Sequence, residues 1–274
     1  MANANLDSAE NVDDLFTACL AGDREDDAAW NAVKKLHFLG TREVLDKATD
    51  LTRSDDLLRR ARGADILGQL GVQPGIASTS FVSERLHALL SLLNGERNPV
   101  VLNSAIIALG HLREPEGIRA VLPFSQHPDE NVRYAVACSL PHGLGDEPDV
   151  IATLIQLMSD SDSDVRDWAT FGLGTQSDAD SGAIREALFN RLADTDEDTR
   201  AEAAVGLARR NDLRVLPVVL QELDRDEYGV LYEEAASHLL GRGEIKPKDW
   251  ESWRYVEELR RYFNVQDSAD SPVQ

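Results

Sequence analysis

The chain has 274 residues, of which 42% are apolar and 6% aromatic, and it carries a formal net charge of −21 at pH 7. This negative field repels phosphate backbones, so it argues against a nucleic-acid binder and favours a protein or peptide partner of basic character. No apolar run approaches the ~18 residues of a membrane span, and the polar N-terminus lacks a signal-peptide pattern. We therefore expect a cytoplasmic protein with no membrane partner.

Residues 1–11 are small and polar and are expected to be flexible. A pattern recurs from there onward, and we describe it from an anchor position at which arginine is the commonest residue. Mostly small residues follow the anchor at three and four positions, leucine follows at seven, and in three repeats glycine follows at eight. The anchors in chain order are Ala29, Arg60, Leu102, Arg133, Arg166, Arg200 and Tyr232.

Successive anchors are 31 to 34 residues apart, except for a step of 42 residues that contains a Gly-, Pro- and Ser-rich loop at 71–80. A second apolar-periodic segment precedes each anchor helix, as at residues 150–160, 184–194 and 215–226. The joins between the two segments are acidic, and their aspartates suit the first turn of the next helix. The sequence thus predicts an all-α protein, an α-solenoid of about seven antiparallel helix pairs that forms a single domain over residues 12–263.

The C-terminal part differs from the repeats. Residues 247–263 are rich in aromatic side chains, and we expect a capping helix there that covers the last repeat. A helix that binds a partner or a second copy is the alternative. Residues 264–274 have a composition typical of a disordered tail.

The motif is clearest in "VRDWATFGLG" (165–174) and "TRAEAAVGLA" (199–208). It resembles the HEAT-repeat family, in particular the short bacterial repeats that are also found in phycobiliprotein lyases. The resemblance implies that the anchor helices line a concave groove. It also implies that turn aspartates and anchor arginines pair between neighbouring repeats as a ladder, here through Arg133, Arg166 and Arg200. Leu102 and Tyr232 depart from this pattern.

Helical geometry places the positions one, two, five and nine residues after each anchor on the outward face. An aromatic patch ringed by polar residues is the usual mark of a binding site, and the alternative is that neighbouring repeats cover these rings as core. Charged residues are expected at the two ends of the groove, with Lys34 and Arg62 early and Glu202, Glu233 and Glu234 late. The predicted groove residues are Ile107, His111, Tyr134, Cys138, His142, Trp168 and Phe171.

The chain lacks the His and Cys spacings of a metal site and the common catalytic motifs. We therefore expect no metal, no cofactor and no catalytic residue, and favour a non-enzymatic scaffold that binds a protein or peptide in the groove. Two alternatives stay open. One is a lyase-like protein that binds a tetrapyrrole or another small apolar ligand, and the other is a toxin-neutralising or regulatory protein with a basic partner.

Overall fold

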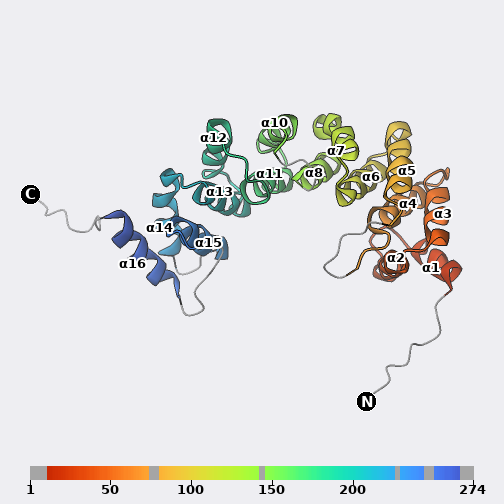
Figure 1. The fold of residues 1–274 in the computed structure, drawn as a ribbon, viewed down its shortest axis with the longest axis horizontal. Coiled ribbons are helices and arrows are strands. Elements are labelled where there is room, and N and C mark those ends of the chain that lie inside the picture. Colours follow the sequence, from red (N-terminus) through yellow and green to blue (C-terminus); the bar gives the residue numbers. More distant parts are fainter. Residues whose placement is uncertain (1–10, 74–79, 142–145, 226–228, 244–249, 266–274) are drawn as a thin grey trace, which may run out of the picture. The chain divides into compact units, whose positions relative to one another are not determined.

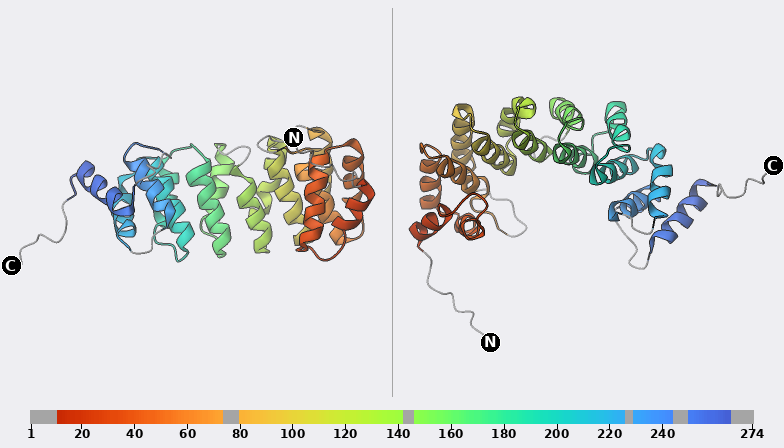
Figure 2. Two further views of the ribbon diagram at one scale, coloured as in Figure 1. Left: turned by 90° about the horizontal axis from the view of Figure 1, so that it is seen from below. Right: turned by 180° about the vertical axis from the view of Figure 1, so that it is seen from behind.

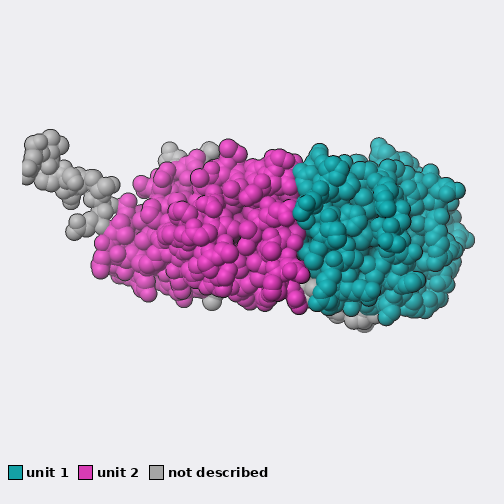
Figure 3. Space-filling view, turned by 90° about the horizontal axis from the view of Figure 1, so that it is seen from above, with its two compact units in different colours: residues 1–144 teal, residues 145–274 magenta. Residues whose placement is uncertain are grey.

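The computed structural model describes residues 11–73, 80–141, 146–225, 229–243 and 250–265 (Figure 1). All the regular elements in these ranges are helices, which confirms the predicted all-α solenoid. The chain divides into two compact units, unit 1 (Met1–Leu144) and unit 2 (Gly145–Gln274) (Figure 3).

Unit 1 contains four helix pairs, and in each pair the second helix carries one of the first four anchors. In the fourth pair, the first helix, α7, continues as a short 3-10 turn. The pairs are α1 (Val12–Cys19) with α2 (Asp27–Leu39), α3 (Arg42–Leu51) with α4 (Leu57–Gln69), α5 (Val82–Gly95) with α6 (Pro99–Leu112), and α7 (Pro115–Val121) and η1 (Leu122–Gln126) with α8 (Glu130–Ser139).

Unit 2 contains three further pairs and the capping helix. Within it, α11 continues as one π-helical turn, η2, and α14 is preceded by a 3-10 turn, η3. The pairs are α10 (Pro148–Leu157) with α11 (Ser163–Phe171) and η2 (Gly172–Gln176), α12 (Gly182–Arg191) with α13 (Glu197–Arg209), and η3 (Leu213–Val215) and α14 (Leu216–Leu223) with α15 (Val230–Leu239); α16 (Ser252–Phe263) follows them.

The helices of each unit form two layers (Figures 1 and 2). In unit 1, α2, α4, α6 and α8 pack side by side, with α3, α5 and α7 as the other layer. In unit 2, α11, α13 and α15 form the corresponding layer of second helices. The leucine seven residues after each anchor is buried in every repeat, and each such leucine stabilises the stack by about 1.5–3 kcal/mol. The seven leucines are Leu36, Leu67, Leu109, Leu140, Leu173, Leu207 and Leu239.

The acidic turns cap the second helices, as the sequence predicts. The side chain of Asp162 accepts from the backbone N–H of Val165, and the side chain of Asp196 accepts from that of Thr199. Asp26, Asp56, Asn98 and Asp129 cap α2, α4, α6 and α8 in the same way. Each cap satisfies a backbone donor that the helix leaves open, at about 0.5–2 kcal/mol.

Small residues bring neighbouring second helices close together. A Cβ built on Gly206 would lie 2.7 Å from the Cα of Gly174, and one built on Gly68 would lie 2.9 Å from the Cα of Ala108. In both cases a residue eight positions after one anchor meets the residue six positions after the next anchor. The recurring glycine of the repeat motif is therefore a contact residue, because a larger side chain would push the two helices apart.

Helix α16 packs on α14 and α15 through Tyr255, Val256 and Leu259, which are buried, while Trp253 and Tyr262 stay exposed. This confirms the predicted capping helix over the part that the structure describes. Residues 247–249 of that prediction, and the segments 1–10 and 266–274 that were expected to be flexible or disordered, lie outside the described residues.

Candidate binding face

The second helices of unit 2 bring one aromatic pair beside a group of carboxylates. Trp168 on α11 and Glu202 on α13 occupy the same place in their repeats, two residues after the anchors Arg166 and Arg200. The rings of Trp168 and Phe171 meet edge to face with centroids 5.7 Å apart, and both side chains are half-buried. We call Asp167, Trp168, Phe171, Thr175, Glu202 and Glu234 the aromatic–acidic face.

The π-helical turn η2 shapes this face. It follows Phe171 directly and carries Thr175, whose hydroxyl donates to Oε2 of Glu202 over 3.2 Å. A π turn inserts one extra residue into the helical register, and such turns recur at functional sites. The bond joins α11 to α13 and fixes the Glu202 carboxylate at the surface of unit 2.

Burial raises the pKa values of two carboxyl groups on this face. Glu202 has a pKa of about 7, because burial outweighs the Thr175 hydrogen bond and because Asp167, Glu234 and Asp198 repel its charge. Asp167 has a pKa of about 6, again chiefly through burial, and its buried Oδ1 accepts no hydrogen bond from the described residues. Both groups therefore titrate near neutral pH, unlike ordinary carboxyl groups.

Four poorly exposed carboxylates of the described chain are paired with arginine. Asp194 binds Arg166 at 2.9 Å, and Glu96 binds Arg60 at 2.7 Å. Asp65 and Asp212 bind Arg24 and Arg214, each at 2.7 Å. Asp167 and Glu202 are half-buried and have no such partner among the described residues. Unlike those four carboxylates, Asp167 and Glu202 combine a raised pKa with the lack of a compensating cation in the described ranges.

The unit 1 part of the predicted groove is less open than expected. Ile107 and Tyr134 are half-buried, and the exposed His111 has its Nε2 3.1 Å from Nε2 of Gln69. Cys138 is only 8% exposed, so little of its thiol surface is available to a ligand. Packing of neighbouring helices buries three of the seven positions five residues after an anchor, namely Cys138, Val205 and Ser237. His142 lies outside the described residues.

The expectation that Arg62 is a solvated groove residue is wrong. Its side chain is 0% exposed, lies over the Trp30 ring at 4.5 Å, and donates to the carbonyl oxygens of Asp23 and Arg24. The loop between α1 and α2 folds over this part of α4. Helical spacing indicates which side of α4 Arg62 occupies, but it gives no information about a loop that covers that side.

The three arginines of the predicted ladder all lie at the start of their helices, next to the preceding turn. Arg133 donates to the carbonyl oxygens of His127 and Pro128, and Arg200 to those of Asp194 and Thr195. Arg166 likewise donates to two carbonyl oxygens of its own turn, and in addition forms two hydrogen bonds of 2.9 Å with the Asp194 carboxylate of the next turn.

The comparison with known families agrees with this architecture. Residues 86–174 and 151–239 match the family model of HEAT repeats, and together these matches cover more than half of the chain. The chain belongs to the HEAT-repeat family. The matched residues run from α5 to α15 and include the anchors Leu102, Arg133, Arg166, Arg200 and Tyr232.

Similar proteins occur in bacteria and archaea. Protein YibA of Escherichia coli strain K12 is 26% identical over 235 residues, which are 84% of this chain and 80% of that protein. The X-ray structure of the E. coli protein superposes with a TM-score of 0.71 at 23% identity, over 92% of this chain and 93% of the other. An archaeal HEAT-like repeat protein from Thermococcus onnurineus gives a TM-score of 0.55 at 17% identity, over 92% and 99% of the two chains. These structural likenesses show the fold.

Two negative findings apply to the described ranges. No described helix combines the length and the apolar character that a membrane span requires. Within the same ranges, no group of three or more His, Cys, Asp or Glu side chains is arranged to hold a metal ion.

Proposed function

We propose that this HEAT-repeat protein is a non-enzymatic scaffold that binds a basic segment of another protein on the aromatic–acidic face of unit 2. The observation that carries the proposal is the pair Asp167 and Glu202, two half-buried carboxylates without an arginine or lysine partner among the described residues. The tetrapyrrole and toxin alternatives stay predictions from the sequence.

Keeping these two carboxylates charged costs the free protein energy. Their raised pKa values mean that the charged forms are unfavourable in the free protein. An arginine or lysine side chain placed against Asp167 and Glu202 would stabilise the charged forms and lower both pKa values again. Part of the free energy of binding would therefore come from relieving a cost that the free protein carries.

The aromatic pair favours a guanidinium over other cations. A planar guanidinium stacks on an aromatic face and pairs with a carboxylate through two N–H groups at once. Trp168 and Glu202 offer these two partners from equivalent positions of adjacent helices. The net charge of −21 also raises the association rate of a basic partner by attraction at a distance.

Binding of a cationic probe to the full chain tests this proposal. We would titrate a labelled peptide in which arginine alternates with serine, and compare the wild type with Glu202→Gln and Trp168→Ala. Each substitution should weaken binding about five- to tenfold, because each removes an interaction of about 1–1.4 kcal/mol. Glu257→Gln, which changes an exposed glutamate on α16, is the matched control and should bind as the wild type does.

Proton release gives a second measurement that does not depend on packing. At pH 6.5 Glu202 is largely protonated in the free protein, so a bound cation should displace a proton from it. Calorimetric titration in buffers of different ionisation enthalpy would detect this proton, and Glu202→Gln should reduce it. Equal affinity of the wild type and Glu202→Gln, with no proton released by either, would contradict the proposed face.

A further inference from the structure

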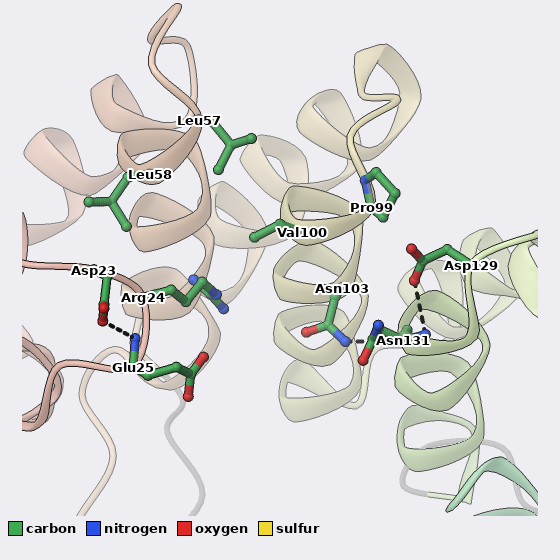
Figure 4. Close-up of a pocket in the computed structure, with 10 residues that line it drawn as sticks. All are labelled: Asp23, Arg24, Glu25, Leu57, Leu58, Pro99, Val100, Asn103, Asp129 and Asn131. Carbon is green, nitrogen blue, oxygen red and sulfur yellow. Dashed lines mark hydrogen bonds between the residues drawn. The ribbon is translucent and has the colours of Figure 1, made fainter. Parts of the chain in front are cut away.

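Unit 1 has a groove at the N-terminal ends of its second helices. The glycine contacts lie near the other ends of these helices. The groove has a volume of about 530 Å³ and lies between the α1–α2 loop and the first turns of α4, α6 and α8 (Figure 4). Its walls combine an apolar centre with carboxylates and carboxamides around it.

The apolar centre comes from the first turns of α4 and α6. Leu57 is 38% exposed and Val100 is 41% exposed, and Figure 4 shows both side chains directed into the space between these two helices. Acidic residues occupy the first turn of α2, α8, α11, α13 and α15, whereas the first turns of α4 and α6 have none. A helix N-terminus favours acidic residues, so two exposed apolar residues in adjacent first turns, both lining one groove, indicate a contact surface.

The rim of the groove is negative. Asp23 and Glu25 lie on the α1–α2 loop, and Asp129 lies at the start of α8. None of these three carboxylates forms an ion pair within the described ranges. Arg24, the one cation among the described residues that line the groove, is held by two hydrogen bonds to Asp65 and one to Ser104. Its charge is therefore compensated, and the rim keeps its negative character.

Two carboxamides lie beside the apolar centre. The side chain of Asn103 donates to the carbonyl oxygen of Asn131 over 2.8 Å, which joins α6 to α8 (Figure 4). The other polar atoms of these two side chains form no hydrogen bond in the described ranges. Carboxamides carry both donors and acceptors, so they suit the backbone of an extended segment.

We infer that this groove is a docking site for an extended protein segment in which one apolar side chain is flanked on both sides by arginine or lysine. The apolar side chain packs between Leu57 and Val100, and the flanking cations pair with the loop carboxylates on one side and with Asp129 on the other. Charge complementarity selects this occupant, because the negative rim repels acidic segments and phosphate groups. The site belongs to unit 1 and does not depend on the aromatic–acidic face.

A matched pair of peptides separates the apolar contribution from the charge contribution. The first probe carries two arginines on each side of a leucine, and the second has serine in place of that leucine. The wild type should bind the leucine peptide about tenfold more tightly than the serine peptide, because burial of the leucine contributes roughly the free energy of a tenfold change. Equal affinity for the two peptides would overturn the inference.

Three single substitutions test whether the peptides bind in this groove. Val100→Ser should remove most of the preference for the leucine peptide over the serine peptide. Glu25→Gln should weaken the binding of both peptides to the same extent. Leu213→Ser changes an apolar residue in unit 2 that is 51% exposed, and it should change neither affinity. Because all three residues are exposed, their thermal melts should match that of the wild type. A preference for leucine that survives Val100→Ser would overturn the groove as its source.

Two further measurements separate binding in this groove from binding at the unit 2 face and from self-association. Trp168→Ala should leave the leucine preference unchanged even if it abolishes the binding proposed for unit 2, so the two proposals can fail separately. Sedimentation equilibrium of the free protein tests the competing occupant, a second copy of this chain. Self-association that Val100→Ser abolishes would overturn the inference in favour of that occupant, whereas a monomer would support the segment from another protein.

Discussion

At the scale of single residues, the anchor arginine stabilises the turn that precedes its own helix. Arg60, Arg133, Arg166 and Arg200 each donate to the carbonyl oxygens six and five residues earlier. Such charged hydrogen bonds contribute about 1.5–3 kcal/mol when they are shielded. The sequence indicates that arginine recurs beside acidic turns, but it does not mark these partners, because every residue has a carbonyl oxygen.

Part of the candidate site follows from the sequence alone. Helical spacing predicts that Trp168 and Glu202 share a face, since both follow an anchor by two residues. It cannot predict the π turn that brings Thr175 to Glu202, nor the loop that buries Arg62. The π turn is a local change of helical register and the loop lies inside the first helix pair, and a repeat pattern contains no information on either.

The raised pKa of Glu202 predicts a specific dependence of stability on pH. The folded pKa is about 7 and the ordinary value is 4.5, so between these values the folded protein binds a proton that the unfolded chain has lost. The contribution of this group is therefore complete below pH 4.5 and is lost as the pH rises through about 7. Glu202→Gln should be more stable than the wild type at pH 8 by about 1–3 kcal/mol, and nearly equal to it at pH 4.5.

Urea unfolding at the two pH values measures this difference. Glu257→Gln, the exposed control on α16, should match the wild type at both. If Glu202→Gln differed from the wild type by the same free energy of unfolding at pH 4.5 and pH 8, the Glu202 carboxyl would not titrate between these pH values. A bound cation could then gain no free energy by stabilising the charged form of Glu202.

At the scale of helices, the repeat pattern predicts the pairs and the cap well because each repeat presents the same contact problem. The leucine seven residues after the anchor fills the stack in every repeat, so its recurrence reveals the number of pairs. Positions where the pattern varies are harder to interpret. Glycine stands eight residues after the anchor in only three repeats, and there it meets a small residue of the next second helix, as Gly174 meets Gly206.

Two glycines of unit 2 give a matched test of this contact. A Cβ on Gly206 would lie 2.7 Å from the Cα of Gly174, whereas a Cβ on Gly182 at the start of α12 would meet nothing within 4 Å. Gly206→Ala should lower the free energy of unfolding by about 1–3 kcal/mol, because α11 and α13 must separate. Gly182→Ala should be neutral or stabilising by up to about 1 kcal/mol, because alanine restricts the unfolded chain. Equal urea midpoints for the two variants would contradict the close helix contact.

At the scale of the whole molecule, charge is the dominant feature, with 49 acidic and 28 basic residues. Some of this charge is paired at the surface, as between Arg42 and Glu84, but exposed pairs contribute only about 0–1 kcal/mol each. The uncompensated excess of −21 repels itself in the compact state and attracts cations in solution. One property of the chain thus lowers the stability of the fold and favours basic partners.

Salt should therefore act in opposite directions on folding and on binding. Raising NaCl from 0.05 to 0.5 M shortens the screening length from about 14 to about 4 Å. The melting temperature should rise by about 3–8 °C, because screening of the excess negative charge outweighs the loss of weak surface pairs. The same change should weaken the binding of all three arginine-containing peptides, since their attraction to the protein is screened as well. Scanning calorimetry and peptide titration on one preparation would measure both effects.

A melting temperature that falls with salt would mean that surface ion pairs stabilise the fold more than the excess charge destabilises it. Peptide binding that salt leaves unchanged would mean that carboxylates are not what the peptides contact.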